Sequence, residues 1–292
     1  PMPDVRLEQR RFTVESGLPA GARCHEVARP GRAGGQRSWA VAWLRFSSEG
    51  LSLAGYLAAP AGPRPSDHGV VLCHGYPNKG RGAENSGKSF PQLADRLSES
   101  LGWPVLTINF RGCAKSEGDF SLDGWQHDIA AAIDEVAALG IAHVWLVGFG
   151  TGGSLCICEG ASNPKVAGVA AAGSPADFDD WAKHPRDLLE HSRLVGVIRD
   201  DDFPADEDAW GRALRSTRPV DRVTELASRP LFLLHGSADE VVPAVDPLAL
   251  ADAHGTAEFR LIEGAGHELR HDPRAVAMLT GWLSRTSRSL QS

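Results

Sequence analysis

The sequence has no apolar run of the roughly 18 residues that a membrane-spanning helix needs. Its first residues, Pro1–Asp4, do not open a basic-then-apolar signal peptide. It also lacks a positive charge excess, because 30 Lys and Arg stand against 37 Asp and Glu, a net charge of −7. Phosphate binding needs clustered Lys and Arg, so this balance argues against a nucleic-acid partner. The absences predict a cytoplasmic protein without membrane contact.

Cysteine is also sparse. An odd number of cysteines without a regular framework indicates reduced thiols. Two of them are two positions apart in a predicted helix and point to different sides, so we interpret them as packing residues and expect no metal site. No cofactor motif is present, and we expect no cofactor. The five cysteines are Cys24, Cys73, Cys113, Cys156 and Cys158.

Short apolar runs alternate with helical patterns along most of the chain, which is typical of a parallel sheet covered on both faces. The predicted strands are Trp39–Phe46, Leu51–Ala58, Gly69–Cys73, Pro104–Asn109, Val144–Gly148, Val166–Ala172, Leu231–His235 and Glu258–Ile262. Apolar residues at helical spacing, or a direct strand-to-helix turn, predict helices over Phe90–Leu101, Trp125–Leu139, Gly152–Glu159 and Ala275–Leu283.

Two regions depart from this alternation. Residues 1–38, rich in Gly, Arg and Pro, are predicted to form an irregular extension before a domain over residues 39–292. The segment between the strands at 166–172 and 231–235 is longer than one crossover needs. We interpret residues 177–221 as a small helical cap over the carboxyl ends of the strands, where open α/β sheets bind ligands. A helix pair that merely decorates the surface is the alternative.

The segment 144–153 is an apolar strand that runs into a glycine-rich turn and a helix. In the nucleophile-elbow pattern G-x-S-x-G, small residues two before and two after the nucleophile let the strand and helix approach closely. Gly148 and Gly152 stand at those two positions. The spacing therefore places Gly150 at the nucleophile.

Two other interpretations of this turn are weaker. A frame centred on Thr151 would put Phe149 where a small residue is needed, so we reject Thr151 as a nucleophile. The glycines also fit G-x-G-x-x-G, but a dinucleotide-binding turn normally follows the first strand of its sheet and is joined by a ribose-binding acid. This turn follows about the fifth predicted strand, and no such acid stands out.

Other segments carry the remaining parts of one constellation. The turn His74-Gly75-Tyr76-Pro77 resembles the His-Gly-x-Pro turn that offers one oxyanion-hole N–H, here from Tyr76, and the second would come from Thr151. The segment 109–118 resembles an R-G-x-G-x-S-x-G loop, with Ala114 in place of a glycine. The segments 233–243 and 262–267 resemble the loops of an acid, Asp239, and a catalytic histidine, His267.

In these motifs and their order, nucleophile then acid then histidine, the chain resembles the α/β-hydrolase superfamily, near its esterase, dienelactone-hydrolase and prolyl-oligopeptidase-like members. The resemblance implies an α/β-hydrolase fold: a mostly parallel eight-stranded sheet with helices on both faces and a small helical cap. It implies Asp239 and His267 as catalytic residues. We further expect substrate contacts from His74, Gly75, Trp181 and Trp210.

Glycine at the nucleophile position changes what this constellation is able to do. Gly150 has no side chain to deprotonate or acylate, so serine-type covalent hydrolysis is not expected. The elbow conformation costs a residue with a side chain about 1–3 kcal/mol, and glycine adopts it with little strain. The possible substitutes Cys73, Cys113, Ser154 and Ser174 do not occupy positions that this fold uses for nucleophiles.

The sequence therefore predicts a protein that binds a small carbonyl- or ester-like ligand under the cap, with general-base chemistry by His267 and Asp239. A pseudoenzyme acting through protein partners is one alternative. An active esterase or peptidase is the other, with an unrecognised nucleophile or with its serine removed by engineering. A homo-oligomer is left open.

Overall fold

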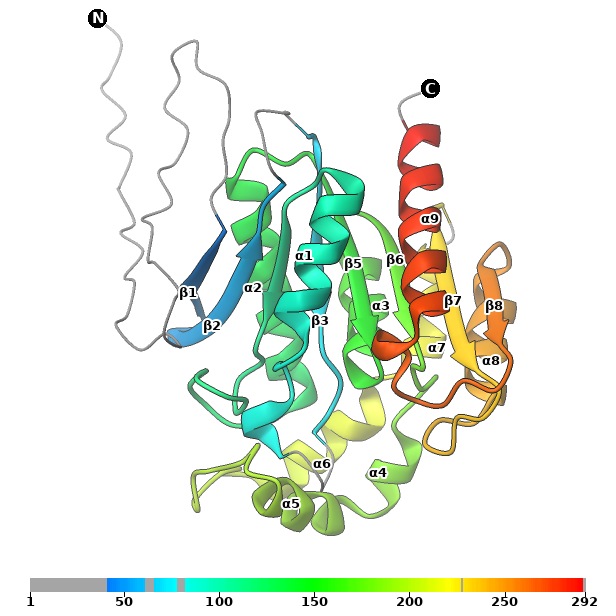
Figure 1. The fold of residues 1–292 in the computed structure, drawn as a ribbon. Helices are drawn as coiled ribbons and strands as arrows, with labels where there is room; N and C mark the ends of the chain where they lie inside the picture. Colours follow the sequence, from blue (N-terminus) through cyan, green and yellow to red (C-terminus); the bar gives the residue numbers. More distant parts are fainter. Residues whose placement is uncertain (1–40, 61–65, 78–81, 227, 291–292) are drawn as a thin grey trace, which may run out of the picture.

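The computed structural model describes residues 41–60, 66–77, 82–226 and 228–290. The predicted extension at 1–38 and Cys24 lie outside the described residues. Within these ranges eight strands form one sheet in the order β1-β2-β4-β3-β5-β6-β7-β8 (Figure 1). Their bounds are β1 (Ala42–Ser48), β2 (Leu51–Ala58), β3 (His68–Cys73), β4 (Val105–Ile108), β5 (His143–Phe149), β6 (Val166–Ala172), β7 (Leu231–Gly236) and β8 (Glu258–Ile262).

The sheet is antiparallel only at the β1 end. Strand β2 pairs antiparallel with β1 and with β4, and every other neighbouring pair is parallel. The β1–β2 hairpin turns through Glu49 and Gly50 at φ 48 and φ 86, the positive pair that a two-residue type I′ turn requires. The predicted mostly parallel sheet of eight strands is confirmed.

Helices cover both faces of the sheet, as the sequence predicts. One buried cluster joins a face of the sheet to α1 (Phe90–Leu101) and α9 (Pro273–Ser289). A second cluster joins the other face to α2 (Leu122–Ala138), α3 (Thr151–Ser162) and α8 (Val245–His254). The helix α8 was not predicted, because its apolar residues do not gather on one side: Leu250 is buried whereas Leu248 is exposed.

Four helices connect β6 to β7, in the range interpreted as a cap: α4 (Asp179–Lys183), α5 (Pro185–Leu194), α6 (Glu207–Ser216) and α7 (Pro219–Arg222). We call residues 177–222 the helical insertion. Figure 1 shows α4, α5 and α6 beyond the carboxyl ends of the parallel strands. Single 3₁₀ turns complete the elements, at η1 (Ala83–Asn85), η2 (Val223–Leu226) and η3 (Leu269–His271). No helix in the described part of the chain is both long and apolar enough to cross a bilayer.

Candidate active site

The turn between β5 and α3 has the close packing that the glycine spacing predicts. A Cβ at Gly148 would overlap the Cα of Gly153, and a Cβ at Gly152 would overlap the carbonyl oxygen of His74. Between them, Gly150 has φ 54 and ψ −131, a conformation that residues with a side chain rarely adopt. Close packing therefore requires glycine at positions 148 and 152, and the backbone conformation favours it at position 150.

His267 and Asp239 are hydrogen-bonded. His267 Nδ1 lies 2.9 Å from Asp239 Oδ2, and Asp239 Oδ1 accepts N–H bonds from Val241 and Val242 at 2.9 and 3.0 Å. The Asp239 side chain is fully buried, whereas 30% of the His267 side chain is exposed. Burial alone would raise the pKa of Asp239, but the N–H groups of Val242 and Val241 and the His267 ring hold that pKa below its usual value. Asp239 is thus an ionised acceptor that orients His267.

The free side of the His267 ring points toward the turn. A Cβ built on Gly150 would lie 3.5 Å from His267 Nε2, an ordinary van der Waals distance. Gly173, directly after β6, lies on the other side of the pair, because a Cβ there would be 3.4 Å from both Asp239 Oδ2 and His267 Nδ1. Sequence reasoning missed Gly173. The available signal was a glycine at the carboxyl end of a predicted strand.

The turn after β3 lies against the turn after β5. A Cβ on Gly75 would stand 3.0 Å from the Phe149 carbonyl oxygen and 3.7 Å from the Gly150 Cα. Tyr76 follows Gly75, and Thr151 is the first residue of α3. The structure therefore brings together the two segments whose N–H groups are the predicted oxyanion donors.

His74 was expected to contact substrate, and this expectation is wrong. Its ring is fully buried, with Nδ1 2.7 Å from the Gly75 carbonyl oxygen and Nε2 accepting the Phe110 N–H at 3.3 Å. Burial lowers the pKa of His74 to about 4, so the ring is neutral at physiological pH. His74 holds the turn from the core side instead of facing the ligand space.

A cavity of about 700 Å³ opens where these segments meet. Of the predicted site residues, Gly75, Tyr76, Gly150, Thr151, Trp181 and His267 line it. Aromatic and aliphatic side chains form much of the wall, and charged groups of both signs, among them Asp246 and Arg270, lie on it as well. Its other apolar lining residues are Pro77, Phe90, Phe149, Pro175, Phe178, Leu188, Val241, Val242 and Pro243.

Trp210, the other tryptophan expected to bind substrate, does not line this cavity. Only 6% of it is exposed, and its indole Nε1–H donates to the Phe120 carbonyl oxygen at 3.2 Å. Trp210 is a core residue that packs the helical insertion onto the domain. The expectation is corrected for Trp210, while Trp181 lines the cavity.

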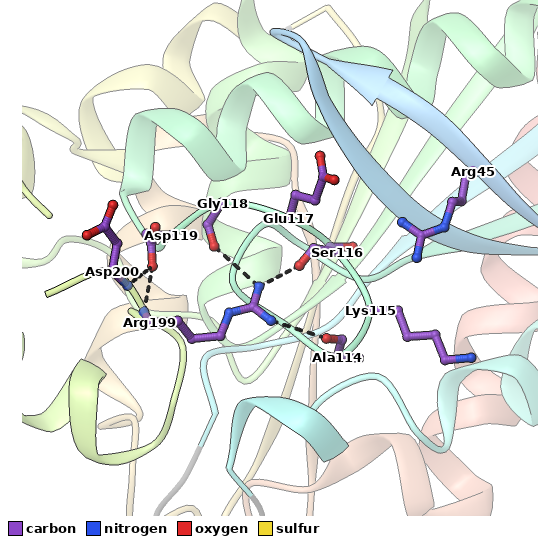
Figure 2. Close-up of a pocket in the computed structure, with 9 residues that line it drawn as sticks. All are labelled: Arg45, Ala114, Lys115, Ser116, Glu117, Gly118, Asp119, Arg199 and Asp200. Atoms are coloured by element: carbon purple, nitrogen blue, oxygen red, sulfur yellow. Dashed lines mark hydrogen bonds between the residues drawn. The ribbon is translucent and has the colours of Figure 1, made fainter. Parts of the chain in front are cut away.

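A second hollow, of about 560 Å³, lies on the surface beside the 114–119 loop (Figure 2). Arg199 from the helical insertion donates to the carbonyl oxygens of Ser116 and Gly118, so its guanidinium binds the loop. Ala114, where the motif has a glycine, keeps the left-handed φ of 46 that glycine favours. This hollow lies between the helical insertion and the loop, and none of its lining residues lines the cavity beside His267.

A metal site is not seen among the described residues, in which no group of three or more His, Cys, Asp or Glu is arranged to hold an ion. The four cysteines within the described ranges are free and buried.

A doubly covered, mostly parallel sheet with an acid, a histidine and a strand-to-helix turn at its carboxyl edge defines an α/β-hydrolase fold. The chain belongs to the alpha/beta hydrolase family, whose model matches residues 70–279.

Among curated proteins, the chain is similar to the uncharacterized protein YfhR of Salmonella typhi, with 25% identity over 211 residues. The match covers 68% of this chain and 64% of YfhR. The YfhR protein of Salmonella typhimurium matches over the same shares. The chain therefore spans less than two thirds of the length of these relatives.

Solved structures show the same fold at low identity. The esterase domain of a Rhodothermus marinus protein is 20% identical with a TM-score of 0.62, over 86% of this chain and 98% of that one. Est1E of Butyrivibrio proteoclasticus is 16% identical with a TM-score of 0.61, over 85% and 98%. Proline iminopeptidase of Mycobacterium smegmatis is 17% identical with a TM-score of 0.61, over 85% and 100%.

Proposed function

We propose that the protein binds a small ester or carbonyl compound in the cavity and activates water on it through His267, without an acyl-enzyme. One observation carries the proposal. A Cβ built on Gly150 would lie in van der Waals contact with His267 Nε2, and the other ring nitrogen, His267 Nδ1, is hydrogen-bonded to Asp239. In this proposal Gly150 stands at the position where a serine hydrolase has its nucleophile. The histidine is left with a polarised water, not a serine hydroxyl, as its partner.

The burial of the other candidate nucleophiles supports a non-covalent reaction. Cys73 and Cys113 are fully buried, and burial raises the pKa of the Cys113 thiol to about 12. Ser154 Oγ donates to the Pro175 carbonyl oxygen at 2.6 Å. Ser174 is buried as well. None of these four lines the cavity.

The proposed step balances without a cofactor. His267 Nε2 takes a proton from water as the water oxygen adds to the carbonyl carbon, and the C=O electron pair moves onto the oxygen. The N–H groups of Tyr76 and Thr151 stabilise that oxyanion. Collapse of the adduct expels the alkoxide, which takes the proton back from His267 and leaves as an alcohol. Asp239 stabilises the imidazolium between the two transfers.

The cavity suits a small ester. Its volume of about 700 Å³ and its aromatic wall fall in the range of small-molecule sites. The esterase domain from Rhodothermus marinus supports an ester ligand, and one structure of Est1E holds ferulic acid. We therefore assign the ligand class as a carboxylic ester of modest size.

The test compares hydrolysis of p-nitrophenyl acetate by the native chain and by His267→Ala. We expect slow, burst-free turnover that falls roughly 10²–10⁴-fold in His267→Ala, the usual contribution of a general base. His127→Ala is the matched control, because His127 is exposed, binds Glu49 and does not line the cavity. Mass spectrometry after a fluorophosphonate probe should find the native chain unmodified.

Each contrary result points to a different alternative. Probe attached to one residue of the native chain would mean that a nucleophile exists, and the water mechanism would be wrong. Turnover that survives in His267→Ala would remove the histidine from the reaction. A native chain that binds esters and never hydrolyses them would leave the pseudoenzyme alternative.

A further inference from the structure

Tyr76 lies in the turn after β3 that carries one predicted oxyanion donor, and its side chain contacts the helical insertion. Its hydroxyl oxygen lies 2.7 Å from Ser192 Oγ in α5, and Ser192 Oγ lies 2.7 Å from the Leu188 carbonyl oxygen. A serine hydroxyl has one proton, and the carbonyl of Leu188 accepts it. The Tyr76 O–H is therefore the donor to Ser192. Burial raises the pKa of Tyr76, which keeps this donor protonated.

Aromatic neighbours restrict where the Tyr76 ring lies. Its centroid is 5.0 Å from that of Phe120 and 5.0 Å from that of Trp181, both in tilted or edge-on arrangements. Trp125 lies at 6.2 Å. With the ring confined on these sides and its hydroxyl bonded, the backbone of residue 76 is constrained through its own side chain.

Ser192 is in turn part of a segment that is firmly attached to the domain. Just after it, the Val195 carbonyl accepts the Ala83 N–H at 2.7 Å, and the Val197 carbonyl accepts the Phe120 N–H at 3.0 Å. Further along, Arg199 donates into the 114–119 loop, as Figure 2 shows. Ser192 itself has no exposed surface. It therefore presents Tyr76 with an acceptor at a defined place.

We propose that Ser192 is a positioning residue for the oxyanion donor at Tyr76. It holds the turn from the side of the helical insertion, while His74 holds the same turn from the core. This inference rests on the proposed function, in which the Tyr76 N–H binds the oxyanion. It assigns the insertion a role in the chemistry as well as in enclosing the ligand.

The test uses Gly150→Ser as a reporter, since a serine there displaces fluoride from a fluorophosphonate while the phosphoryl oxygen occupies the oxyanion site. The second-order labelling rate is measured in this background with and without Ser192→Ala. We expect about a tenfold fall, less than the roughly 10²–10³-fold cost of losing a donor outright, because the N–H is displaced and not removed. Ser192→Thr retains the hydroxyl and should restore most of the rate.

Ser98→Ala is the matched control. Ser98 is a buried residue of α1 that does not line the cavity, and its Oγ donates to the Trp103 carbonyl oxygen at 2.7 Å. It should leave the labelling rate within about twofold of that of the Gly150→Ser reporter, far less than the roughly 10²–10³-fold cost of losing a donor. Tyr76→Phe removes the same hydrogen bond from the other partner, so its rate should fall as in Ser192→Ala, and the double variant should fall no further.

An unchanged rate in folded Ser192→Ala or Tyr76→Phe overturns the inference. So does an equal fall in Ser98→Ala, which would indicate a general loss of stability, and so does a Gly150→Ser reporter that is never labelled. The proposed function is judged separately, on ester hydrolysis by the native chain. A native chain without turnover, whose reporter nevertheless depends on Ser192, would refute the water mechanism and retain the positioning role.

Discussion

Replacing Gly150 with serine should lower stability and create reactivity in the same variant. The residue has φ 54 and ψ −131, where a side chain costs about 1–3 kcal/mol. No overlap adds to this cost, because the nearest atom to a Cβ is His267 Nε2 at 3.5 Å. A domain of this size loses about 2–4 °C of Tm per kcal/mol. We therefore expect Tm to fall by roughly 2–12 °C.

The same geometry gives the new hydroxyl a base. An Oγ on a Cβ at that distance is within reach of a hydrogen bond to His267 Nε2. We expect a fluorophosphonate to label position 150 in Gly150→Ser, detected by peptide mass spectrometry. Gly150→Ala is the control, since it carries the same backbone strain without the hydroxyl. Its Tm should fall by the same amount, and the probe should not label it.

Two results would refute this reasoning. Thermal melts of Gly150→Ser and Gly150→Ala that match the native chain would show that residue 150 does not hold the strained backbone conformation. A Gly150→Ser variant whose Tm falls but which the fluorophosphonate does not label would show that His267 or the oxyanion donors are misplaced.

Further expected outcomes concern His74, Asp239 and the two tryptophans of the helical insertion. His74 has a pKa lowered to about 4, so the stability due to its neutral ring is present above pH 6.5 and about 3 kcal/mol is lost as pH falls toward 4; an NMR titration giving a pKa above 6 would refute this. Asp239→Asn should cut ester hydrolysis roughly 10²–10⁴-fold by misorienting His267. Because the native pKa of Asp239 is depressed, its stabilisation is present above the ordinary value of 3.8 and is lost below it, so urea unfolding should show this acid-side loss in the native chain and not in Asp239→Asn. Trp210→Ala should lower the free energy of unfolding by about 3–5 kcal/mol, whereas Trp181→Ala should mainly weaken ligand binding. If calorimetry finds the larger loss of stability in Trp181→Ala and the larger loss of binding in Trp210→Ala, the core position of Trp210 and the cavity position of Trp181 are both wrong.

The sequence by itself was sufficient for the features that depend on neighbouring residues. Strands β2, β6 and β8 and helix α1 have the predicted bounds, because their apolar patterns are local. The strand-to-helix turn was recognisable for a similar reason, since close packing there demands small residues at fixed spacings on one stretch of chain. Helix α8 escaped prediction because its apolar residues lie on both sides of the helix.

Only the tertiary structure decided which distant residues meet. It turned His74 into the core and placed Gly173 against the Asp239–His267 pair. Tyr76 and Ser192 are 116 residues apart along the chain, and no local spacing relates them. Their contact depends on how the helical insertion packs over the sheet, which is set by the burial of many side chains at once and not by any one motif.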